Sequence, residues 1–156
     1  IDRRTGASWS QIGTSPTNSY NDATAVANTA YLYRVRAVDG SANVSSNSNV
    51  DLATAIVFTH ASLTIGTTAV KAAHFSELRT AVNAVRTLAA LSASSFTDPT
   101  LTSAVSIKGA HLTELRAAVD PARVALGLGV VSYSDVLPIG IQVKAAHINE
   151  LRGAVR

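Results

Sequence analysis

The four histidines of this chain are the residues best suited to chemistry, and all of them lie after residue 57. They are His60, His74, His111 and His147. The chain has no cysteine, so a bound metal ion would take its ligands from His, Asp and Glu side chains. Three of the histidines are followed three residues later by a glutamate: Glu77, Glu114 and Glu150. Three imidazoles around one divalent ion, with an open fourth position, form the pattern of catalytic zinc, and a nearby glutamate can act as general base.

These histidines belong to an internal repeat. Residues 70–79 (VKAAHFSELR) return as 107–116 (IKGAHLTELR) and as 143–152 (VKAAHINELR), with His-to-His spacings of 37 and 36 residues. An aromatic residue and a turn precede each copy: Phe58-Thr59-His60, Phe96-Thr97-Asp98 and Tyr133-Ser134-Asp135. The pattern predicts three units of a loop and a helix. The units are 58–95, 96–132 and 133–156, and the helices lie near 69–91, 106–126 and 142–155.

The phase of these helices predicts where the histidines point. At about 100° per residue, His74 shares an apolar stripe with Val70 and Leu78, whereas Arg79 falls on the far side. Three such stripes are buried most easily around one common axis, so we expect a small pseudo-threefold bundle in which the three helical histidines converge. This convergence predicts a divalent-metal site, with zinc favoured. His60 is a further candidate ligand and can also form a site with His74 alone.

A second interpretation gives the histidines a structural role. A single buried histidine usually bonds a polar group in the core, and Asp98 and Asp135 stand in the loops before His111 and His147. The first copy has His60 at that position instead of an aspartate. The sequence leaves both interpretations open. The repeated arginines are predicted to form surface ion pairs, with an anionic-substrate clamp as the alternative; they are Arg79, Arg116 and Arg152.

Composition and charge exclude several classes of function. Residues 1–57 carry four Arg against four Asp, and residues 58–156 carry nine Lys or Arg against six Asp or Glu. This charge is not clustered, so nucleic-acid binding is not expected. No apolar run approaches the roughly 20 residues of a membrane span, so none is predicted. The chain has no Met, which predicts a piece of a longer protein.

The region before residue 58 has the character of β structure. In residues 31–38 (YLYRVRAV) the side chains alternate with a period of two, which predicts a strand. The face of that strand would carry Tyr31, Tyr33, Val35 and Ala37. A second strand is predicted within residues 49–58.

Residues 26–39 (VANTAYLYRVRAVD) resemble the second half of a fibronectin type III domain, with Tyr31 as the corner tyrosine. The resemblance implies that residues 1–5 are the tail of a central strand and that residues 1–57 form half of an antiparallel β-sandwich. Half a sandwich leaves an apolar sheet face, here the face of Tyr31 and Tyr33, to be covered by the helical region or by a second copy in a homo-oligomer.

Residues 58–156 resemble a triple repeat with an aromatic-Thr-Asp-Pro … Lys-Ala-x-His-x-x-Glu-Leu-Arg signature, found at the C-terminus of large secreted or surface proteins of soil bacteria. This implies a bacterial protein at an extracellular or cell-surface location, but the repeat has no established activity. His60 departs from the signature, which has Asp at that position.

The expected fold is therefore α+β, and two functions follow from it. The first is a metal-dependent hydrolase of an ester or phosphoester. In that case, histidine-bound zinc lowers the pKa of its water to about 7, and Glu77, Glu114 or Glu150 serves as general base. The second is a non-catalytic adhesion or structural module whose core histidines are satisfied by hydrogen bonds. The sequence prediction is the hydrolase, with the module as its alternative.

Overall fold

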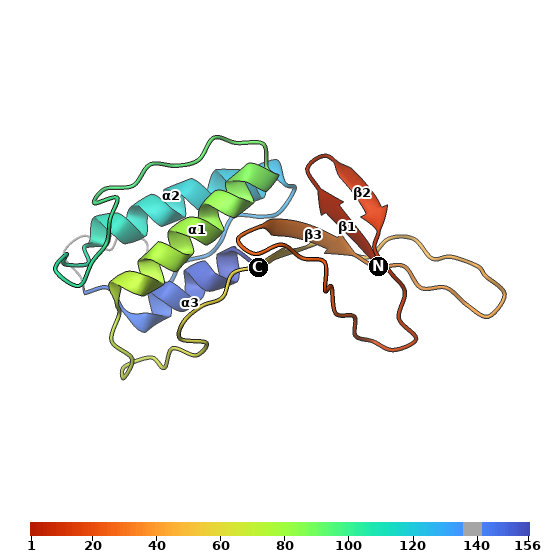
Figure 1. Cartoon of the computed structure of the whole chain (residues 1–156), viewed down its shortest axis with the longest axis horizontal. Coiled ribbons are helices and arrows are strands. Elements are labelled where there is room, and N and C mark those ends of the chain that lie inside the picture. Colours follow the sequence, from red (N-terminus) through yellow and green to blue (C-terminus); the bar gives the residue numbers. More distant parts are fainter. Residues whose placement is uncertain (136–141) are drawn as a thin grey trace.

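A computed structural model describes residues 1–135 and 142–156. Within these ranges the chain forms a four-stranded antiparallel sheet followed by three helices, which confirms the α+β class. Figure 1 shows the helices gathered on one side and the sheet on the other, with β3 (Ala30–Arg34) reaching toward the helices. No helix in the described ranges is long and apolar enough to cross a membrane.

The sheet has the strand order β2-β1-β3-β4. Its strands are β1 (Asp2–Thr5), β2 (Ser8–Gln11), β3 (Ala30–Arg34) and β4 (Asp51–Thr54). A two-residue turn joins β1 to β2, and Gly6 takes a φ of 62° there, which glycine adopts without strain. The sequence did not reveal β2, because its residues SWSQ contain a single apolar side chain and so show no alternation.

The strand predicted over residues 31–38 is shorter than expected. It ends at Arg34, because side-chain hydroxyls take over the hydrogen bonding beyond that point. The backbone N–H of Val35 donates to Ser48 Oγ and that of Ala37 donates to Ser45 Oγ, both at 2.9 Å. Val35 is 50% exposed, so the predicted face that included Val35 and Ala37 is wrong. The second strand likewise occupies only Asp51–Thr54 of residues 49–58.

The first helix, α1 (Ala72–Leu88), packs against β3 and β4, but not on the face that the alternation indicated. Leu32 and its cross-strand partner Leu52 belong to the same buried cluster as the helix residues. Tyr31 lies on the other face, under the guanidinium of Arg3 at 4.6 Å from the ring centroid. Its hydroxyl accepts the backbone N–H of Val26 at 3.0 Å, the type of bond that a corner tyrosine makes.

The three helices contact one another in all three pairs. They are α1 (Ala72–Leu88), α2 (Gly109–Ala125) and α3 (Ala145–Ala154). Each begins about three residues later than predicted, because a lysine is the N-cap of each helix and the first apolar residue of each repeat motif lies before that lysine. These residues, Val70, Ile107 and Val143, pack against the core from outside the helices.

The helical core is apolar and closed to solvent. All three helices contribute apolar side chains that are 0% exposed, among them Phe75, Leu78, Val82, Val85, Leu112, Leu115, Val119, Ile148 and Leu151. The three helical histidines are also 0% exposed, so their predicted inward position is correct. Each buried imidazole therefore needs hydrogen-bond partners within the protein.

Candidate functional site

Each helical histidine helps to cap the N-terminus of its own helix. In α1, Nδ1 of His74 accepts the backbone N–H of Lys71 at 3.2 Å, and the Lys71 carbonyl accepts the N–H of His74 at 3.1 Å. A backbone N–H can only donate, so the neutral ring carries its hydrogen on Nε2. The same two bonds join Lys108 to His111 in α2 and Lys144 to His147 in α3.

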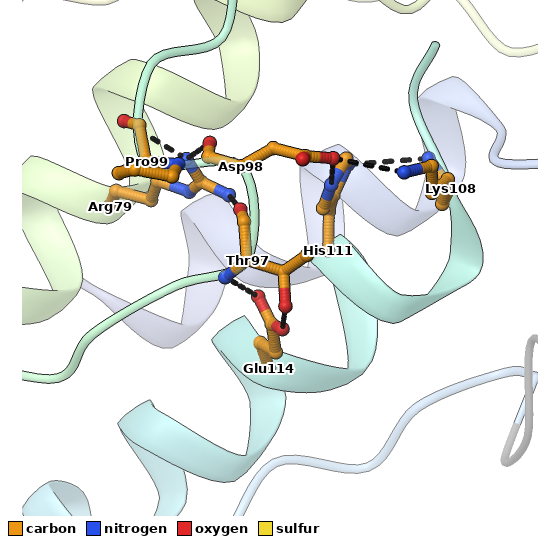
Figure 2. Close-up of polar contacts among 7 residues, drawn as sticks. All are labelled: Arg79, Thr97, Asp98, Pro99, Lys108, His111 and Glu114. Atoms are coloured by element: carbon orange, nitrogen blue, oxygen red, sulfur yellow. Dashed lines mark hydrogen bonds and ion pairs between the residues drawn. The ribbon is translucent and has the colours of Figure 1, made fainter. Parts of the chain in front are cut away.

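In the second and third repeats, Nε2 donates to an aspartate of the preceding loop. His111 Nε2 lies 3.1 Å from Asp98 Oδ2, and His147 Nε2 lies 2.7 Å from Asp135 Oδ2. Figure 2 shows the Asp98 carboxylate held between His111 and Lys108, whose Nζ is 3.0 Å away. The bonds from Lys108 and His111 lower the pKa of Asp98, and the bond from His147 lowers the pKa of Asp135.

The first repeat replaces this carboxylate with an imidazole. His74 Nε2 lies 3.2 Å from His60 Nδ1, and the two rings meet edge to face. Because His74 carries its hydrogen on Nε2, His60 must accept on Nδ1. Burial, together with the nearby His60 and Arg152, lowers the pKa of His74 and keeps its ring neutral.

The glutamates predicted as general bases hold the loops of their own repeats. Glu114 accepts the backbone N–H of Thr97 at 3.0 Å and also bonds the hydroxyl of Thr97, as Figure 2 shows. Glu77 makes the same contacts with Thr59, and Glu150 makes them with Ser134. All three carboxylates therefore accept hydrogen bonds from the loop backbone.

The repeated arginines are buried, so their predicted position at the surface is wrong, although two of them do form ion pairs: Arg116 with Glu150 at 3.0 Å and Arg152 with Glu77 at 3.8 Å. Arg79, Arg116 and Arg152 are 7%, 6% and 2% exposed. Arg79 donates to the carbonyls of Thr97 and Asp98 at 2.6 and 2.8 Å, and its guanidinium lies 5.0 Å from the ring centroid of Phe96. The bonds of its two Nη groups and the contact with the aromatic ring favour this buried position, although its Nε has no hydrogen-bond partner within the described ranges.

Every such arginine contacts the loop of a different repeat, and the contacts form a closed cycle. Arg79 of the first repeat binds the second loop, and Arg116 of the second binds the Asp135 carbonyl and the Tyr133 ring of the third loop. Arg152 of the third repeat returns to the first loop, where it donates to the His60 carbonyl at 2.7 Å and lies 4.3 Å from the ring centroid of Phe58.

The structure brings together only two of the predicted metal ligands, His60 and His74, as far as the described ranges show. His111 and His147 each pair with an aspartate instead, and no group of three or more His, Asp or Glu side chains within residues 1–135 and 142–156 can hold a metal ion. The helical histidines also direct Nε2–H, not a lone pair, at their partners. The residues present therefore do not fit the predicted three-histidine zinc centre.

Two surface hollows lie away from the predicted catalytic residues. One, of about 630 Å³, is lined by residues 70–73 and part of the loop 101–107. The other, of about 820 Å³, lies at the far end of the sheet, between residues 11–20 and the loop 35–44. Neither is lined by a histidine or a glutamate, so neither places a substrate beside the groups proposed to act on it.

Comparison of the chain with protein-family models, with curated proteins and with solved structures found no match. The resemblances to a fibronectin type III domain and to a bacterial triple repeat therefore stay predictions.

Sequence reasoning missed the two contacts that most define this site. The first is the bond from the lysine N–H to the histidine ring, which joins residues three apart. The second is the docking of each arginine on an aromatic loop of another repeat. The recurrence of one aromatic residue and one arginine in every unit was a visible signal for the second contact.

Proposed function

We propose that the chain is a non-catalytic structural or adhesion module of a bacterial cell-surface or secreted protein. One observation carries the proposal: the His, Glu and Arg of each repeat are all used to attach loops to helices. A catalytic group also has to line a pocket that admits a substrate, and neither surface hollow is lined by a histidine or a glutamate. Here the histidine has partners on both ring nitrogens and the glutamate binds a loop.

We also propose that residues 58–156 form a pseudo-threefold unit and that residues 1–57 are half of a fibronectin type III-like sandwich. The cyclic arginine contacts support the first proposal, because each repeat gives the same bond and receives the same bond. The bond between Tyr31 and Val26 supports the second. Homo-oligomerisation through the sheet stays a prediction.

The zinc-dependent hydrolase stays a prediction that the same experiment tests. Metal content is measured after dialysis, and hydrolysis of p-nitrophenyl acetate and of bis(p-nitrophenyl) phosphate is followed with and without a chelator. We expect no stoichiometric metal, no turnover above background and an unchanged melting temperature with chelator. About one zinc per chain together with chelator-sensitive turnover would refute the structural proposal.

Two variants separate the interpretations further. Glu114→Gln and His111→Asn should both lower stability, because each weakens the attachment of a loop. If the chain is a hydrolase, the substitution of a catalytic base lowers turnover while the metal stays bound, and the loss of a ligand removes the metal. Asp51→Asn, at the exposed start of β4, is the control that should change neither property.

A further inference from the structure

The three contacts between repeats differ in how the chain connects their partners. Arg79 and the Asp98 carbonyl are 19 residues apart, as are Arg116 and the Asp135 carbonyl. Arg152 and the His60 carbonyl are 92 residues apart. The contact of the third repeat with the first, here called the closing joint, is therefore held by side-chain contacts without a short chain connection.

The ion pair of the closing joint is longer than the one between the second and third repeats, whereas Arg79 and Glu114 at the remaining joint, both among the described residues, form no ion pair within 4.0 Å. Arg116 Nη2 donates to Glu150 Oε2 at 3.0 Å in the joint between the second and third repeats. The equivalent atoms of the closing joint, Arg152 Nη2 and Glu77 Oε2, are 3.8 Å apart. Both are buried, and neither has a hydrogen-bond partner within residues 1–135 and 142–156. A buried polar atom without a partner raises the free energy of the closed state.

The residue at position 60 also weakens the attachment of the first loop. In the other repeats a carboxylate accepts from the histidine and pairs with the lysine before the helix. His60 accepts from His74 as a neutral ring, and its Nε2 lies 3.5 Å from Lys71 Nζ. A bond to a neutral acceptor is about half as strong as one to a carboxylate. The first loop is thus attached to its helix by the weaker kind of bond.

We propose that the helical region opens at the closing joint, and that residue 60 sets how often it does so. The moving part is the strap, residues 58–71, which runs from the sheet to α1. In the closed state the strap is bound to α3 by Arg152 and by the amide of Asn149, which donates to the Leu63 carbonyl at 3.0 Å. Opening breaks these contacts and separates the strap from α3. This inference goes beyond the proposed function and does not depend on it.

Three equivalent amides report the opening without any substitution. The N–H groups of Thr59, Thr97 and Ser134 each donate to the glutamate of their own repeat, at 2.9, 3.0 and 3.1 Å, and all three residues are exposed. Amide hydrogen exchange of the full chain, measured by NMR, gives a protection factor for each. We expect protection at Thr59 to be roughly tenfold lower than at the other two, because its loop lacks the hydrogen bond between histidine and aspartate that the other two loops have. Equal protection at all three amides would overturn the proposal.

Two reciprocal variants test the role of residue 60. His60→Asp gives the first repeat the aspartate of the other two, and should bring protection at Thr59 to within about twofold of that at Thr97. Asp98→His makes the opposite change and should lower protection at Thr97 while leaving Ser134 unchanged. If Asp98→His does not fold, His60→Asp decides alone. A low protection at Thr59 that His60→Asp leaves unaltered would show that residue 60 does not control the opening.

Discussion

Replacing His111 by alanine tests whether the helical histidines hold the fold together. The ring is 0% exposed, accepts the Lys108 N–H at 3.2 Å and donates to Asp98 at 3.1 Å. Loss of the N-terminal acceptor costs about 1 kcal/mol, and loss of a hydrogen bond to a carboxylate costs about 1.5–3 kcal/mol. The cavity left beside Phe75, whose ring centroid is 6.0 Å from that of His111, adds to this. The expected loss of unfolding free energy is roughly 4 kcal/mol.

Urea unfolding followed by far-ultraviolet circular dichroism measures this loss. His111→Asn is the matched variant, because its amide oxygen can still accept the Lys108 N–H but its shorter side chain does not reach Asp98. We expect it to lose about half as much stability as His111→Ala. His60→Ala is the control, since His60 is only partly buried, and it should cost under about 1.5 kcal/mol.

A loss of unfolding free energy below about 1 kcal/mol for His111→Ala would refute this reasoning, because removing a buried ring with two hydrogen-bond partners should cost more than that. A loss that appears in the wild type on adding a chelator, and that is absent from His111→Ala, would instead show that the histidine acts through a metal.

Three further predictions follow from the contacts described above. Arg116→Lys keeps the charge but loses the contact with the Tyr133 ring and the forked donors, so the melting temperature should fall by an amount equivalent to about 1–2 kcal/mol, and an unchanged value would contradict the arginine docking. Tyr31→Phe leaves the Val26 N–H without its acceptor and should cost about 1–2 kcal/mol in urea unfolding, whereas Tyr20→Phe, at an exposed site, should cost under about 0.5 kcal/mol. Burial would raise the pKa of Asp22, but hydrogen bonds from Thr24, Tyr33 and Arg3 lower it to about 2. Because the folded pKa lies below the ordinary value of 3.8, this stabilisation is present above that pH and is lost as the pH falls toward about 2; Asp22→Asn should remove this part of the acid dependence of stability.

The local features of this chain could be predicted from the sequence because short-range physics decides them. The triple repeat follows from the return of one motif after 37 and 36 residues, and the α+β class and the burial of His74, His111 and His147 follow from periodicities of 3.6 and 2 residues. The first residues of the helices were predicted less accurately. Val70 continues the apolar stripe of α1 in sequence, yet it lies before the helix, because the bond between Lys71 and His74 makes Lys71 the N-cap and the helix begins at Ala72.

The polar partners of the buried side chains were decided by tertiary structure. Counting residues around a helix places Arg79 away from the core, but the loop of the next repeat covers that side and supplies the carbonyls and the ring of Phe96. The histidines point inward as predicted but do not converge. Each ring lies in the first turn, bonds its own helix N-terminus and is held by its own loop.

What the sequence by itself determined is which segments are helical and that their apolar side chains and histidines point inward. Only the tertiary structure showed which polar groups the histidines contact: each bonds its own helix N-terminus and a residue of its own loop. The physical reason is the range of the interactions. The bond of Lys71 to His74 spans three residues and follows from local geometry, whereas the contact of Arg152 with His60 spans 92 residues and exists only once the three helices have packed.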